Sequence, residues 1–137
     1  MNHRRRARGF TLVDVLTACT LVGIVVAFAL PSYQAQITKS RRIDAVAALT
    51  RLQAAQERLR ANTGLYSNDL GVLQVAARSQ EGLYALAVEL NGPDSYRATA
   101  TPLAGGSQVR DAECPQLGLD VKSSFAQIGP TARCWNR

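Results

Sequence analysis

The sequence predicts an α+β protein, in which one long N-terminal helix packs against a small antiparallel sheet. Three observations predict this class. Residues 10–30 form an apolar run with a single charge, residues 32–61 contain neither glycine nor proline, and strand-like segments flank a turn at residues 91–94. With 137 residues, the chain is long enough for one modest domain and one membrane segment.

The N-terminal segment combines a basic tail with the apolar run. Four arginines precede Gly9, and the remainder of the chain carries 12 basic and 10 acidic residues. A helix over residues 10–30 would be about 31 Å long, which matches the hydrocarbon core of a bilayer. The basic tail predicts that this end of the chain stays in the cytoplasm. The one charge in the run is Asp14, and a lone carboxylate at membrane depth costs a few kcal/mol.

The apolar run has two interpretations. It is either a cleaved secretory signal, with Ala27, Phe28 and Ala29 forming a small-x-small cleavage site, or a membrane anchor that the mature protein keeps. The secretory signal leaves Asp14 unexplained and discards a segment whose helical pattern continues past Pro31. We expect Pro31 to kink this helix, because proline lacks a backbone N–H and its ring clashes with the preceding turn.

The second half of the helix, residues 32–62, is predicted to be amphipathic. One side carries the apolar residues Ile37, Ala45, Ala48, Leu49, Leu52, Ala55 and Leu59. The other side carries Asp44, Thr50, Arg51, Glu57 and Arg58, while Arg41 and Gln56 break the pattern. We expect the helix to stop near residue 62, with Gly64 as a left-handed cap.

The globular head is expected to span residues 63–137 and to supply the surface on which the amphipathic half packs. Residues 83–90 and 95–101 read as a hairpin around the turn at 91–94, and residues 117–122 read as a third strand. Two of the three cysteines, Cys114 and Cys134, lie in this region. They can pair if the head lies outside the cytoplasm, and the closed loop would then stabilise it by about 3 kcal/mol.

The residue inventory argues against an enzyme. The only histidine is His3 in the basic tail, so the commonest general base and metal ligand is missing from the rest of the chain. Neither a phosphate-binding glycine loop nor a nucleophile elbow occurs. Asp111 and Glu113 lie close together but read as a solvated loop. We therefore expect no catalytic residues, no metal site and no cofactor.

The stretch Gly9-Phe10-Thr11-Leu12-Val13-Asp14-Val15-Leu16 closely resembles the processing motif of type IV pilins and pseudopilins. The resemblance is tight over residues 9–33 and includes Pro31 and Tyr33. It implies the type IV pilin fold and cleavage of a leader, residues 1–9, by a prepilin peptidase between Gly9 and Phe10. It also implies N-methylation of Phe10, a membrane-embedded segment over residues 10–31, and Pro31 as the helix-kinking proline.

The resemblance also gives Asp14 a role in assembly. In this family an acid at that position pairs with the N-terminal amine of a neighbouring subunit, and low dielectric strengthens such a pairing. The family usually has glutamate there, and aspartate is one methylene shorter. The implied partners are other pilin subunits, the prepilin peptidase and the bacterial inner membrane before assembly. The implied location is a single pass with a periplasmic head, and then the extracellular pilus.

Within this family the chain looks most like a PilE-type minor pilin, with adhesion, twitching motility or DNA uptake as the pilus activity served. A pseudopilin of a type II secretion system is the first alternative, although that group usually lacks the cysteine pair. A DNA-receptor pilin is the second, but beyond residue 63 six basic residues face seven acidic ones, so charge balance does not support nucleic-acid binding. A periplasmic protein with an ordinary signal peptide is the alternative from another class.

Overall fold

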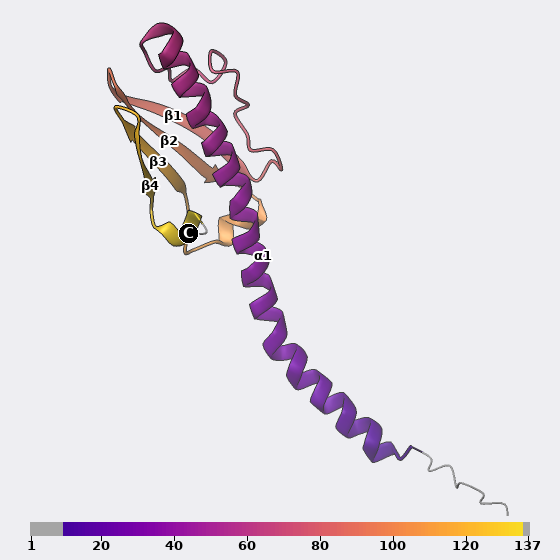
Figure 1. Cartoon of the computed structure of the whole chain (residues 1–137). Helices are drawn as coiled ribbons and strands as arrows, with labels where there is room; N and C mark the ends of the chain where they lie inside the picture. Colours follow the sequence, from indigo (N-terminus) through magenta and orange to yellow (C-terminus); the bar gives the residue numbers. More distant parts are fainter. Residues whose placement is uncertain (1–9, 136–137) are drawn as a thin grey trace, which may run out of the picture. The chain divides into compact units, whose positions relative to one another are not determined.

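The computed structural model describes residues 10–135 of the chain. The described residues form two compact units, which meet between residues 36 and 37. The first unit contributes the start of a single long helix, α1 (Leu12–Thr63). The second unit holds the rest of α1 and a four-stranded sheet, and there the helix lies along one face of the sheet (Figure 1). The predicted leader, residues 1–9, lies outside the described residues.

The ends of α1 follow from local sequence signals. The helix begins directly after Thr11, whose side chain caps the first turn, and it runs for 52 residues with Pro31 inside it. Gly64 follows the last helical residue with φ at +81°, and its N–H donates to the Arg60 carbonyl at 2.7 Å. Glycine adopts this left-handed conformation without steric cost. The predicted cap at Gly64 is therefore confirmed.

The sheet is an antiparallel meander in the order β1-β2-β3-β4. Its strands are β1 (Tyr84–Gly92), β2 (Ser95–Pro102), β3 (Leu117–Lys122) and β4 (Phe125–Gly129), and two short 3-10 helices are η1 (Ser107–Arg110) and η2 (Ala132–Trp135). The predicted hairpin and third strand are confirmed. Strand β4 was not predicted, because it is a short edge strand whose first three residues are exposed. It therefore lacks an alternating apolar pattern.

The core lies between α1 and the inner face of the sheet. It is built from buried side chains of the helix and of alternating strand positions, among them Ala45, Ala48, Leu49, Leu52, Tyr84, Tyr96, Ala98, Ala100, Leu117, Leu119 and Val121. Small residues at the helix positions and on β2 let the backbones approach closely, while leucines and tyrosines fill the remaining volume. The apolar side predicted for the amphipathic half is therefore the side that packs.

Asp44 and Gln56 are polar residues of α1 that are buried: Asp44 departs from its predicted face, and Gln56 was predicted to break the pattern. Asp44 was expected on the solvent side, but it is only 7% exposed and its Oδ1 accepts the Glu81 N–H at 3.1 Å. Gln56 is fully buried, and its amide donates to the Ser67 carbonyl and accepts the Ser67 N–H. Both side chains tie α1 to the loop before β1, because the backbone of that loop needs partners that the sheet does not supply.

Candidate functional site

The N-terminal turn of α1 shows how Asp14 is satisfied within one chain. Its Oδ2 accepts the Thr11 N–H at 2.9 Å and the Thr11 hydroxyl at 2.7 Å, and its own N–H donates to Thr11 Oγ1 at 3.2 Å. This reciprocal arrangement is a capping box, and an acid here also complements the helix dipole. An intersubunit role for Asp14 stays a prediction. Phe10 is exposed, and Gly9 lies outside the described residues.

The first part of α1 is long and apolar enough to cross a membrane, by length and composition. Its large apolar side chains, from Leu12 to Leu30, are exposed in the single chain, which is the arrangement a lipid or filament environment would cover. The helix is continuous through Pro31, and the kink expected there remains a prediction.

A groove of about 630 Å³ in the second unit is lined by arginines. Its walls are the exposed side of α1, the chain between residues 73 and 80, and Leu86 of β1. Arg51 and Arg58 come from α1, two helical turns apart, and Arg78 comes from the chain just before β1. Aspartate and glutamate are absent from the residues that line this groove. The groove is therefore a concentrated patch of positive charge over an apolar floor.

The three arginines differ in how firmly they are held. Arg51 donates from Nε to the Ala47 carbonyl at 3.2 Å and from Nη1 to Gln80 Oε1 at 3.0 Å. The exposed guanidinium groups of Arg58 and Arg78 have no hydrogen bond or ion pair to any residue from 10 to 135. An exposed guanidinium with all its donors unused suits a planar or tetrahedral oxyanion such as phosphate.

The sequence alone undervalued this groove. The balance of six basic and seven acidic residues beyond residue 63 does not include Arg51 and Arg58, which lie in α1, and it includes residues that lie on other faces. A usable signal was present, because two arginines seven residues apart lie on one helix face. Arg78 reaches the groove only because the loop after α1 returns to β1. In that loop Arg78 pairs with Ala85 in an isolated antiparallel bridge.

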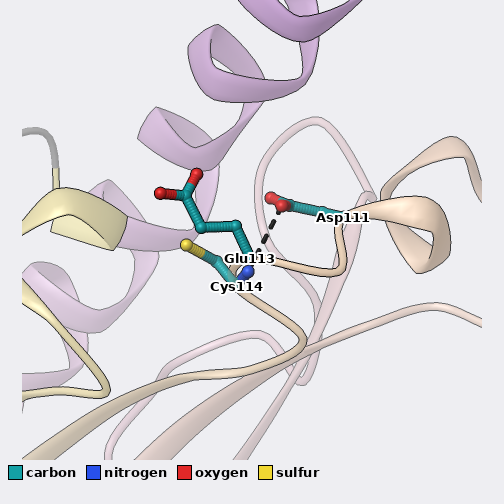
Figure 2. Close-up of side chains that lie close together, drawn as sticks. All are labelled: Asp111, Glu113 and Cys114. Carbon is teal, nitrogen blue, oxygen red and sulfur yellow. Dashed lines mark hydrogen bonds between the residues drawn. The ribbon is translucent and has the colours of Figure 1, made fainter.

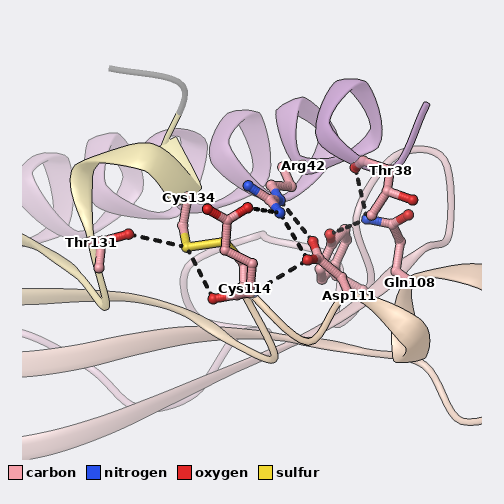
Figure 3. Close-up of polar contacts among 9 residues, drawn as sticks. Thr38, Arg42, Gln108, Asp111, Cys114, Thr131 and Cys134 are labelled. Atoms are coloured by element: carbon pink, nitrogen blue, oxygen red, sulfur yellow. Dashed lines mark hydrogen bonds and ion pairs between the residues drawn. A yellow bond between two sulfur atoms is a disulfide. The ribbon is translucent and has the colours of Figure 1, made fainter. Parts of the chain in front are cut away.

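Asp111 and Glu113 do not form the solvated loop that the sequence suggested. Arg42 of α1 donates from Nε to Asp111 Oδ2 at 2.7 Å, from Nη2 to Asp111 Oδ1 at 2.8 Å, and from Nη2 to Glu113 Oε2 at 2.8 Å (Figure 3). The side chains of Arg42 and Asp111 are only 5% and 3% exposed. The hydrogen bonds that Arg42 donates to Asp111 are the largest influence raising the pKa of Arg42.

The ligand atoms of Asp111, Glu113 and Cys114 lie within 4.8 Å of one another (Figure 2), a spacing that could suit a metal ion. The chemistry of the three groups does not fit one. A metal-binding cysteine must be a thiolate, whereas Cys114 Sγ is bonded to Cys134. Both carboxylates already pair with Arg42. The cluster is therefore a buried ion pair beside a disulfide.

The disulfide joins the segment just before β3 to η2. Cys114 and Cys134 are both fully buried, with their Cα atoms 5.7 Å apart. Trp135 is 7% exposed, and its indole N–H donates to the Gly129 carbonyl at 2.9 Å, so it packs inside the head. Nearby, Gln108 Nε2 donates to the Thr38 carbonyl and the Tyr84 hydroxyl (Figure 3). These contacts fasten the segment after β2 to α1.

Residues 31–118 match the family described as type IV minor pilin ComP, DNA uptake sequence receptor. No curated protein matches the chain. The matched range holds the amphipathic half of α1, the arginine groove and strands β1 and β2, but it leaves out Asp14 and Cys134. It favours a pilus subunit over a secretion-system pseudopilin. Because the matched range covers more than half of the chain and the fold is a long apolar helix with a small antiparallel sheet, this chain belongs to the type IV minor pilin ComP family.

Proposed function

We propose that this minor pilin binds DNA at the surface of a type IV pilus, and that the arginine groove formed by Arg51, Arg58 and Arg78 contacts the phosphate backbone. The groove carries the proposal, because it gathers three guanidinium groups with no lining carboxylate, two of them without a partner in the described chain. The family description, a DNA uptake sequence receptor, supports the same ligand. Pilins are structural subunits, and we propose no catalytic step.

The N-terminal segment supports a route by which the protein reaches the pilus. We propose that a prepilin peptidase cuts between Gly9 and Phe10, that Phe10 is N-methylated, and that residues 10–31 hold the chain in the inner membrane with the head in the periplasm. Other pilin subunits then pack on this helix, and Asp14 pairs with the Phe10 amine of a neighbour. The capping box supports a folded first turn, which would present Asp14 at a fixed place.

DNA binding by the full chain in detergent tests the proposal. Arg58→Ala and Arg78→Ala should each weaken binding to every DNA sequence. Each should also lower the slope of log affinity against log salt by about 0.9, because one phosphate contact is lost. Arg110→Ala is the matched control, since Arg110 is exposed and lies in η1, outside the groove. The proposal fails if the parent does not bind DNA, or if the double variant Arg58→Ala/Arg78→Ala keeps the parent's affinity and salt slope.

Assembly has its own test. Asp14→Ala should insert, be cleaved and fold its head, but it should reach sheared filaments poorly, because a neighbour's amine would be buried without a partner. Asp14→Glu is the conservative control and should be tolerated. Equal partition of Asp14→Ala and the parent between filaments and membranes would leave Asp14 with only its helix-capping role.

A further inference from the structure

A second recess lies on the outer face of the sheet, near the tips of both hairpins, and has a volume of about 670 Å³. Its lining includes Asn91 of β1, Lys122 of β3, and Phe125 and Gln127 of β4. The ring of Phe125 is 81% exposed, more than any other large apolar side chain of the described head. We call this recess the Phe125 cleft. Covering an exposed phenyl ring removes apolar surface from water, so a ligand that covers the ring would bind more tightly.

The turn that carries Phe125 is held firmly. Ser123 and Ser124 both have left-handed backbones, with φ at 48° and 69°, which is the conformation of a tight two-residue hairpin turn. Ser123 Oγ donates to Asp94 Oδ2 at 2.6 Å, and the Ser123 N–H donates to the Asp94 carbonyl at 2.9 Å. The contact joins the β3–β4 turn to the β1–β2 turn, at one end of the sheet (Figure 1). The hydroxyl of Ser123 lowers the pKa of Asp94, so this contact is charge-assisted at neutral pH.

A second anchor joins the same turn to the end of α1. Ser124 Oγ donates to Glu57 Oε2 at 3.0 Å and accepts from Arg60 Nη1 at 3.1 Å. A tight turn held by several specific contacts fixes the position of the residue that follows it. The exposed ring of Phe125 therefore stands on a turn fastened on two sides.

The polar groups around the ring suit a nucleobase and its phosphate. The exposed amide side chains of Asn91 and Gln127 make no hydrogen bond to any residue from 10 to 135. Lys122 lies directly across from Phe125 in the β3–β4 register. Asp120, the one lining carboxylate, is paired with Arg97 at 3.0 Å, whereas Lys122 makes no ion pair within residues 10–135 and interacts with the nearby Asp94 carboxylate only at longer range. An aromatic ring, two free amides and a lysine are the groups that stack on a base, read its edge and hold its phosphate.

We propose that the Phe125 cleft takes one base of bound DNA, with Phe125 against the base face, Asn91 or Gln127 at the base edge, and Lys122 at the adjoining phosphate. The proposal rests on the DNA binding proposed above. It adds a contact to a base to the phosphate contacts of the arginine groove. The same contact can come from a base step of a duplex, into which a phenyl ring wedges, or from an unpaired base, on which it stacks. The amides favour adenine, whose edge offers one donor and one acceptor.

The test uses the full chain in detergent, with a short labelled duplex and its separate single strand as probes. Phe125→Ala should weaken binding roughly 5- to 150-fold, the range of one lost base–aromatic contact, and leave the salt slope unchanged. Phe125→Trp should keep the affinity, and DNA should quench the fluorescence of the new indole. Val109→Ala is the control, because Val109 is an exposed apolar residue of η1, 56% accessible, outside the cleft. A loss on the duplex alone identifies wedging, and a loss on the single strand identifies stacking.

The outcomes separate the two proposals. If the parent binds neither probe, DNA binding itself fails. If the parent binds and the groove variants weaken it, while Phe125→Ala binds like the parent and Phe125→Trp is not quenched, only the base contact is overturned. If Phe125→Ala instead lowers the amount of the protein in sheared filaments and leaves DNA binding intact, Phe125 is a contact between pilin subunits and the proposal is wrong.

Discussion

Removing Arg42 should be among the most damaging single changes in the head. Its guanidinium makes two hydrogen bonds to Asp111 and one to Glu113, at 2.7 to 2.8 Å, from a side chain that is only 5% exposed. In Arg42→Met, the buried Asp111 carboxylate keeps the Cys114 N–H, at 3.2 Å, but loses its charged partner. Breaking a buried ion pair on one side costs about 3–5 kcal/mol. Small domains have about 5–15 kcal/mol of stability in total.

The chain offers a matched control for this prediction. Arg97 pairs with Asp120 at 3.0 Å, but the two side chains are 53% and 42% exposed. Water screens such a pair, so Arg97→Met should cost at most about 1 kcal/mol. The double variant Arg42→Met/Asp111→Leu should recover much of the loss, because it removes both buried charges at once.

The assay is urea unfolding of the full chain in detergent, followed by the fluorescence of Trp135, the only tryptophan of the chain. Trp135 is 7% exposed and lies next to Cys134, so its emission reports on this part of the head. The reasoning is refuted if Arg42→Met costs no more than Arg97→Met, or if the double variant is less stable than Arg42→Met alone.

Two further changes test the packing of the head. Tyr96→Phe should raise the free energy of unfolding by about 1 kcal/mol, because the buried Tyr96 hydroxyl has no hydrogen-bond partner among the described residues. Tyr84→Phe should lower it by a similar amount, since the Tyr84 hydroxyl accepts from Gln108 Nε2 at 2.8 Å, and equal effects in urea unfolding would contradict this difference. Loss of the Cys114–Cys134 disulfide should destabilise the head by about 2–5 kcal/mol. Thiol labelling of the native exported protein should find neither cysteine free, and labelling of both would contradict the disulfide.

Some of the fold could be predicted from local patterns. The apolar run over residues 10–30 predicted a membrane-length helix, and the spacing of Ala45, Leu49 and Leu52 predicted which side of α1 is buried. The glycine at residue 64 predicted where the helix ends. These features depend on residues close together in the sequence, and the repeats of 3.6 and 2 residues fix which side chains share a face.

Strand β4 and the fate of single polar residues could not be predicted in this way. Strand β4 is a short edge strand that is stabilised by pairing with β3, and its own composition does not reveal this pairing. Asp44 and Gln56 looked like solvent-facing or irregular positions of the helix. Burial became favourable for them only because backbone groups of the following loop meet their side chains.

The sequence by itself determined the class of this protein, through the motif at Gly9 and Phe10, the acid at Asp14 and the helix that follows. Only the tertiary structure decided which charged side chains are buried in pairs and which gather on the surface. Arg42 and Asp111 lie 69 residues apart, and packing alone makes them a buried pair. The return of the chain from α1 to β1 brings Arg78 into the same groove as Arg58. Spacing places side chains within one element, whereas side chains of different elements meet only where the packed core brings their surfaces together.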